Sequence, residues 1–147
     1  MEPDNTDSCS PIEVESVCKI LHAIGITSEV VETGHPMYIR FTYNDMSYRL
    51  VFDDIPFLSL VLMFDFNPEE EDIELMKDAA QYVSLRSFGA VVFVVPEDAY
   101  WLVGYDIFAD SESYLQKNLN VFLDVLGNVG WYFYEYYHRL KSKHSKR

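Results

Sequence analysis

The chain has 147 residues, of which 49% are hydrophobic and 16% are aromatic, and its formal net charge is −13. This length suits one domain with a proper core, and the apolar content excludes an intrinsically disordered chain. Residues 1–138 hold six basic residues against 24 acidic ones, a formal charge of −18. A body this negative repels phosphate backbones, so we expect no nucleic-acid partner.

The expected compartment follows from the cysteines and from the lack of a signal-peptide pattern and of a membrane-spanning run. Cys9 and Cys18 are the two cysteines and give no disulfide framework, which suits a reducing compartment. The first residues lack the basic and apolar regions of a signal peptide. The longest apolar run, residues 57–66, is too short to cross a bilayer as a helix. We therefore expect a cytoplasmic protein that does not insert into a membrane.

The first helix is predicted after an acidic, polar leader, residues 1–9, which we expect to be disordered. Ser10 and Glu13 form a capping box, and Pro11 suits the first helical position. Gly25 predicts a left-handed end to the helix. Apolar residues at helical spacing lie between these signals: Val14, Val17, Cys18, Leu21 and Ile24.

A change of period then predicts strands. Residues 37–43 and 46–52 each alternate between apolar and polar side chains, and Asn44-Asp45 joins them, which is typical of a hairpin with one buried face. Residues 57–66 are almost all apolar, which predicts either a central strand covered on both faces or a strand with one face against another molecule. Residues 29–33 form either a further short strand or a lead-in.

The second half repeats this order of helix and strands. Asn67-Pro68-Glu69-Glu70 predicts the start of a helix that ends before Gly89. Residues 90–95 predict a buried strand, and the short turn at 96–98 predicts an antiparallel partner at 99–105.

A long amphipathic helix is predicted from Asp110 to Leu140. Its wide apolar stripe needs a large partner surface, and the sheet is the obvious one. Gly127 and Gly130 predict either a kink or the close approach of another backbone. The basic tail, residues 141–147, is expected to be solvated and frayed, the alternative being a contact with an anionic partner.

These elements predict one α+β domain, residues 10–140. Its antiparallel sheet has about five strands in the order α-βββ-α-ββ-α, and the long C-terminal helix packs on the sheet.

No motif in the sequence indicates catalysis. The four histidines have no metal-ligand spacing, and no glycine-rich phosphate loop or G-x-S-x-G elbow is present. Asp53 and Asp54 with Asp65 are most simply a solvated acidic turn and a strand end. We expect no catalytic residue, no metal and no cofactor.

The remaining signal is aromatic. Residues 131–137 carry six aromatic side chains, which at helical spacing point nearly all around the helix, so a single sheet cannot cover them. These side chains can pack in the core or form an interaction surface, and the sequence leaves both interpretations open. The predicted interaction surface consists of Trp131, Tyr134 and Tyr137 on the helix, with Phe57 and Leu60 on the apolar strand.

The order of elements, the acidity, the Asn67-Pro68 helix start and the hairpin of residues 90–95 and 100–105 resemble the YbjN-like bacterial sensory transduction regulators. That family in turn resembles the type III secretion chaperones. The resemblance covers about residues 10–140 and rests on no invariant signature. It implies a small acidic dimer that binds proteins and catalyses nothing.

We therefore expect a non-enzymatic protein-interaction module, chaperone-like or regulatory, that acts as a homodimer. The alternative is a small-molecule sensor with a cavity between the sheet and the long helix, because eleven tyrosines supply hydroxyls that can orient a ligand.

Overall fold

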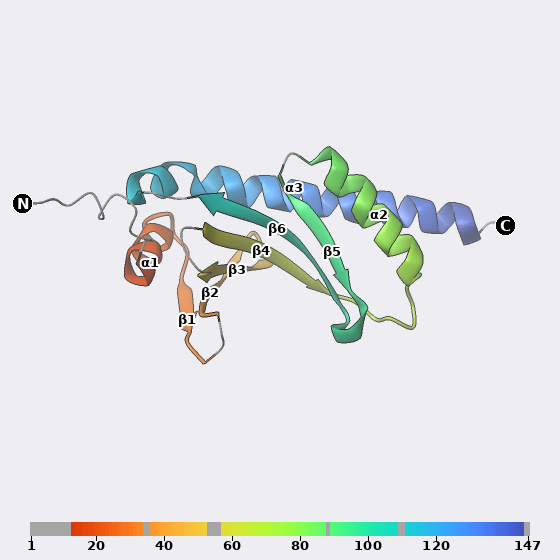
Figure 1. Cartoon of the computed structure of the whole chain (residues 1–147), viewed down its shortest axis with the longest axis horizontal. Helices are drawn as coiled ribbons and strands as arrows, with labels where there is room; N and C mark the ends of the chain where they lie inside the picture. The colour runs from red at the N-terminus through yellow and green to blue at the C-terminus, as the bar shows by residue number, and fades with distance from the viewer. Residues whose placement is uncertain (1–12, 34–35, 53–56, 88, 109–110, 146–147) are drawn as a thin grey trace, which may run out of the picture. The chain divides into compact units, whose positions relative to one another are not determined.

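Six strands and three α-helices form the described part of this computed structural model, which comprises residues 13–33, 36–52, 57–87, 89–108 and 111–145 (Figure 1). The α+β class, the antiparallel sheet and the long C-terminal helix packed on it are as predicted. The strand order in the sheet is β1-β2-β3-β4-β6-β5. The elements are α1 (Val14–Ala23), β1 (Ser28–Val31), β2 (Tyr38–Tyr43), β3 (Met46–Phe52), β4 (Phe57–Asp65), α2 (Ile73–Arg86), β5 (Val91–Val95), η2 (Pro96–Asp98), β6 (Tyr100–Phe108) and α3 (Glu112–Ser145).

The sheet has one strand more than the five expected. Ser28–Val31 forms a strand that pairs antiparallel with β2, so four strands precede α2. The order is therefore α-ββββ-α-ββ-α, and the alternative of a mere lead-in at residues 29–33 is wrong. The chain divides into two compact units, residues 1–61 with 106–123 and residues 62–105 with 124–147. β4, β6 and α3 each contribute to both units.

The first unit is built on the predicted hairpin. β2 pairs with β3 up to Tyr43 and Met46, and Asn44 and Asp45 both have positive φ, as a two-residue turn of this kind requires. Ile39 and Leu50 face the core as expected, and Tyr48 lies beside them with its hydroxyl donating to the Leu123 carbonyl at 3.0 Å. The predicted burial pattern of the hairpin is therefore confirmed.

The first helix begins later in the chain than predicted. α1 starts at Val14, and Glu13 before it makes no side-chain capping bond. Ser10 and Pro11 lie outside the described residues, as does the predicted acidic leader. Gly25 has φ +87° and donates its amide to the His22 carbonyl, which confirms the left-handed end of the helix.

The second unit holds the β5–β6 hairpin, α2 and the second part of α3. Trp101 packs between Phe64 and Phe133, with ring centroids 4.4 and 4.5 Å away. A Cβ added at Gly130 would lie 3.5 Å from Leu62 and Phe64 side-chain atoms, so the sheet approaches the helix backbone closely there. α3 is helical without interruption from Glu112 to Ser145, which favours close approach over a kink at Gly130.

Two further helix boundaries differ from the prediction. α2 begins at Ile73 and not after Asn67, because Asp72 is the residue whose carboxylate accepts the Leu75 amide. Asn67 instead accepts the Glu69 amide within a preceding turn. α3 continues beyond Leu140 through most of the predicted frayed tail, and Lys141 is held in place by polar contacts described below.

Candidate interaction surface

The second part of α3 sorts its aromatic side chains between core and solvent. Phe133 and Tyr137 are one helical turn apart on the side that faces the core, and both are buried. Trp131 and Tyr134 point elsewhere and are 61% and 48% exposed. The rings of Trp131 and Tyr134 stack at 5.7 Å, and Tyr134 contacts the His138 ring at 4.3 Å. We call Trp131, Tyr134 and His138 the α3 aromatic face.

A second aromatic group on α3 is taken up by α2. Tyr136 stacks on Tyr82 with centroids 4.2 Å apart, and the Arg86 guanidinium lies 3.6 Å above the Tyr82 ring. Tyr132 contacts Tyr136 at 6.4 Å. Partial burial raises the pKa of Tyr132, and the neighbouring Tyr82 adds to the shift. The tyrosines on this side of α3 therefore pack against other parts of the same chain and need no partner protein to account for them. Within the described residues, Trp131 and Tyr134 make no such contact with α2 or the core.

Two residues of the predicted surface are not on the surface of the chain. Tyr137 is 2% exposed, and Leu60 is fully buried together with Leu58 and Leu62 on one face of β4. The prediction for these two residues is wrong for a physical reason. A continuous apolar run does not reveal which of its alternate side chains face the core, and Tyr137 follows Phe133 by one helical turn. Phe57 begins β4, but its side chain lies outside the described part of the structure.

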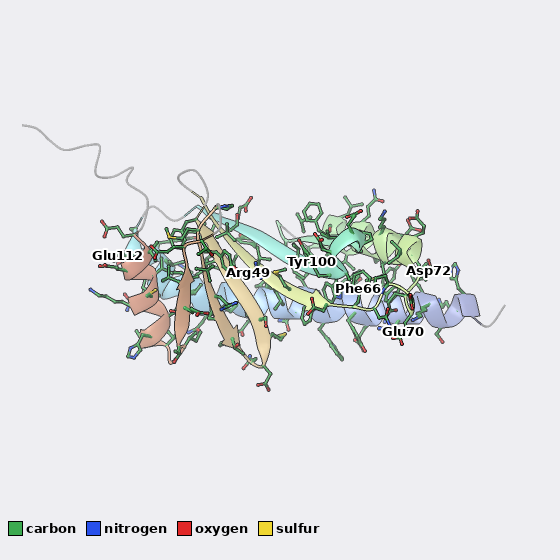
Figure 2. The ribbon with its side chains drawn as sticks, turned by 90° about the horizontal axis from the view of Figure 1, so that it is seen from below. Arg49, Phe66, Glu70, Asp72, Tyr100 and Glu112 are labelled. Atoms are coloured by element: carbon green, nitrogen blue, oxygen red, sulfur yellow. The ribbon has the colours of Figure 1, made fainter. Side chains whose placement is uncertain are left out.

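The Tyr137 hydroxyl has a structural task instead. It accepts the Asp72 amide at 2.9 Å and donates to Glu71 Oε1 at 2.8 Å. Lys141 Nζ donates to the same Glu71 oxygen at 2.8 Å and to the Glu70 carbonyl at 2.9 Å. Figure 2 shows Glu70 and Asp72 in the turn that precedes α2. We call Glu71, Asp72, Tyr137 and Lys141 the polar latch, because together they tie this turn to α3.

The protonation states in the polar latch fit this task. Burial, reinforced by the carboxylate of Glu71, raises the pKa of Tyr137 to about 12. Burial opposes ionisation of Glu71, but hydrogen bonds from Lys141 and Tyr137 outweigh it, so the pKa of Glu71 is below its ordinary value. A protonated tyrosine and an ionised glutamate are therefore maintained at neutral pH. They act as donor and acceptor in a closed network and not as an exposed acid and base.

The β5–β6 hairpin carries exposed apolar residues that the sequence did not reveal. Residues 90–95 were expected to be buried throughout, yet only Ala90 and Val92 are, while Phe93 is 57% and Val91 39% exposed. β5 is the last strand in the sheet order, and its second face is open. An apolar run without alternation gives no sign that one of its two faces is exposed, so this surface could not be found from the sequence.

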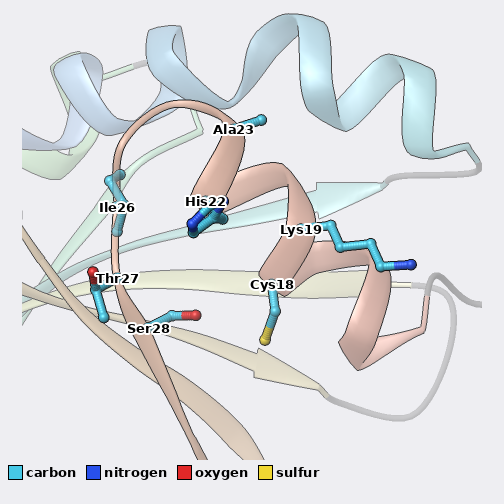
Figure 3. A pocket seen from close by; sticks show the side chains of 7 residues that line it. All are labelled: Cys18, Lys19, His22, Ala23, Ile26, Thr27 and Ser28. Atoms are coloured by element: carbon cyan, nitrogen blue, oxygen red, sulfur yellow. The ribbon is translucent and has the colours of Figure 1, made fainter.

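A cavity of about 430 Å³ lies beside α1 in the first unit (Figure 3). Cys18 and His22 lie one helical turn apart in its wall, and Thr27 and Ser28 come from the chain that leads into β1. Among the described residues no three His, Cys, Asp or Glu side chains gather as metal ligands. This cavity lies beside α1, whereas the small-molecule hypothesis expected one between the sheet and the long helix. That hypothesis also relied on tyrosine hydroxyls to orient a ligand, but the buried hydroxyls of Tyr48 and Tyr137 donate hydrogen bonds to groups of the protein itself.

Comparisons with known proteins agree with the fold. No protein-family model matches this sequence, and the search of curated proteins gave no match. The fold is similar to the crystal structure of an uncharacterized protein from Methanothermobacter thermautotrophicus, with a TM-score of 0.56 and 18% sequence identity. The match covers 84% of this chain and 97% of that protein. In the described residues, no helix is both long and apolar enough to cross a membrane.

Proposed function

We propose that this chain is a non-catalytic protein-interaction module, chaperone-like or regulatory, that acts as a homodimer. The observation that carries the proposal is the exposed Trp131 stacked on Tyr134. Tryptophan and tyrosine are enriched at protein interfaces and often dominate their binding energy. The other aromatic side chains of residues 131–137 lie in the core or contact the Tyr82–Tyr136 stack, so this pair is the part of α3 that is suited to an external contact.

A second copy of the chain is the occupant that the charges favour. Glu135 and Arg139 are exposed on α3, one helical turn apart, and neither forms an ion pair with another described residue. Two α3 helices packed antiparallel about a two-fold axis at the level of residue 137 would place Arg139 of each copy beside Glu135 of the other. The same arrangement brings Trp131 of each copy to the level of Lys143 of the other, within reach of a cation–π contact.

The self-complementary pattern matters because the body of the chain carries a charge of −18 before its basic end. Two such bodies repel each other unless basic residues lie at the contact. α3 supplies those residues at Arg139 and Lys143. The resemblance to YbjN-like regulators and the cytoplasmic location stay predictions, and both are compatible with a small acidic dimer.

Solution mass tests the proposal. Light scattering on the full chain is expected to give the mass of a dimer at low micromolar concentration, and Trp131→Ala is expected to give a monomer with an unchanged far-UV spectrum. Tyr114→Ala is the matched control, because Tyr114 is an exposed aromatic residue of α3 in the other unit. A wild-type chain that is monomeric at every concentration would refute the dimer.

Charge reversal tests the arrangement of the helices. Glu135→Arg and Arg139→Glu each place like charges together across the two-fold axis, so each variant is expected to weaken the dimer. The double variant restores opposite charges across the axis and should recover the wild-type mass. Because the reversed pair keeps its spacing within one helix, helix stability changes little. A double variant that stays monomeric would show that this antiparallel pairing is wrong.

A further inference from the structure

The open face of the β5–β6 hairpin is a second apolar surface. Cross-strand pairs join Val91 to Gly104, Phe93 to Leu102 and Val95 to Tyr100, so these six residues, five with side chains and one glycine, share one face. Their neighbours Val92, Trp101 and Val103 face the core and are buried. Single exposed apolar side chains are normal, but a contiguous group of this kind is typical of an interaction site. We call these six residues the hairpin face.

The hairpin face has an open space at Gly104. A Cβ built on Gly104 would have a single neighbour within 4 Å, the Cδ1 atom of Leu102 at 3.7 Å. The cross-strand partner Val91 is 39% exposed, so no described side chain covers this position. An apolar side chain from outside can therefore lie over Gly104, between Val91 and Leu102.

The charged residues of the hairpin turn and of the end of β4 have one sign. In residues 62–66 and 89–105, Asp65, Glu97 and Asp98 are acidic and exposed, and no lysine or arginine occurs. A second copy placed face to face would bring these carboxylates together, so self-association is disfavoured here. The surface matches a partner that has basic residues on either side of an apolar centre. This pattern differs from the mixed charges of Glu135 and Arg139 on α3.

The outer edge of β5 is partly occupied. The Val92 amide donates to Ser84 Oγ at 2.8 Å, and the Ala90 amide donates to the Ser87 carbonyl at 2.8 Å. Both acceptors come from the end of α2 and the residue after it, and Figure 1 shows α2 running beside β5. An added strand would need these amides. The occupant therefore contacts the hairpin through side chains on the open face.

We propose that the hairpin face docks a segment of a partner protein with apolar side chains flanked by lysine or arginine. The inference goes beyond the proposed dimer, because it concerns another surface with a different occupant. A failure of the dimer leaves it intact.

Fluorescence anisotropy with the full chain tests the proposal, using three labelled peptides of equal length as probes. The first has a Val-Leu-Val-Phe centre flanked by lysines, the second has the same centre flanked by glutamates, and the third has a serine centre flanked by lysines. We expect the first peptide to bind with a Kd at least about tenfold lower than either of the others. This difference separates the combined pattern from charge or apolar contact alone.

Three variants assign the binding to the hairpin face. Phe93→Ser and Gly104→Val are expected to raise the Kd of the first peptide about tenfold, the former by removing an apolar contact and the latter by filling the open space. Val30→Ser is the matched control, because Val30 is an exposed strand residue of the other unit, and its Kd should equal the wild-type value. Phe93 is 57% exposed, and a Cβ at Gly104 meets only the Leu102 side chain, so both variants are expected to fold; thermal unfolding of each variant checks this.

Three outcomes would overturn the proposal. In the first, all three peptides bind alike. In the second, the first peptide binds Phe93→Ser as tightly as the wild type. In the third, Phe93→Ser abolishes a dimer that Trp131→Ala leaves intact, which would show that a second copy covers the hairpin face.

Discussion

The polar latch makes a sharp prediction for Tyr137→Phe. This change removes one oxygen from a side chain that is 2% exposed and keeps its ring, which stacks on Phe133 at 6.2 Å. The Asp72 amide loses its acceptor, and Glu71 loses one of its two side-chain donors but keeps Lys141. The ring contacts are unchanged, so any loss of stability comes from the hydrogen bonds.

The magnitude follows from the unpaired amide. A partly buried donor left without an acceptor costs about 1–3 kcal/mol, whereas a hydrogen bond exchanged for water costs far less. We expect the free energy of unfolding to fall by about 2 kcal/mol, which lowers the Tm of a chain of this size by roughly 6 °C. Urea unfolding followed by far-UV circular dichroism measures the first value, and calorimetry measures the second.

Tyr134→Phe is the matched control, since it removes the same oxygen from a 48% exposed side chain on the same helix. Its effect on the unfolding free energy should lie within about 0.5 kcal/mol. If Tyr137→Phe is no more destabilising than Tyr134→Phe, the latch does not hold the turn before α2 to α3.

Three further predictions follow from local geometry. The pKa of Glu71 is lowered in the folded state, so its contribution to stability is complete above the ordinary value of 4.5 and is lost as the pH falls through the folded value. Glu71→Gln should therefore flatten the acid limb of a plot of unfolding free energy against pH, and an unchanged slope would contradict the contact with Lys141. Gly130→Ala places a Cβ at ordinary contact distance, 3.5 Å from Leu62, so it should raise the unfolding free energy by up to about 1 kcal/mol, whereas Gly130→Leu should lower it by about 1–3 kcal/mol. Asp72→Ala should lower the unfolding free energy by about 1 kcal/mol and Asn67→Ala by less, because Asp72 caps α2; the reverse order in urea unfolding would restore the boundary predicted from the sequence.

Local signals sufficed for the elements that depend on few residues. The alternation of residues 37–52 with Asn44-Asp45 between its halves specified the first hairpin, its register and its buried face. The apolar stripe of α3 specified the longest helix, although not its last turn. In each case the information lies in residues two to four positions apart.

Position in the sheet could not be predicted in the same way. β1 has four residues and no alternation, and its pairing with β2 is visible only in the fold. Residues 91–95 are all apolar, and such a run does not show whether both faces of the strand are covered. The exposure of Phe93 could therefore not be predicted from the sequence. The burial of Tyr137, by contrast, could have been predicted from the sequence, because Tyr137 lies four residues after Phe133 on the core side of α3.

The two apolar surfaces of the second unit differ in charge, and this difference separates their partners. α3 carries Glu135 and Arg139 one turn apart, a pattern that a two-fold axis can match with itself. The hairpin turn carries Glu97 and Asp98, and the end of β4 carries Asp65, with no lysine or arginine in residues 62–66 and 89–105, a pattern that a copy of itself cannot match. Self-association and partner binding can therefore be altered independently: Trp131→Ala should abolish the dimer and leave the Kd of the lysine-flanked peptide unchanged. Phe93→Ser should have the opposite effects. A variant of either residue that impaired both activities would show that one surface serves both.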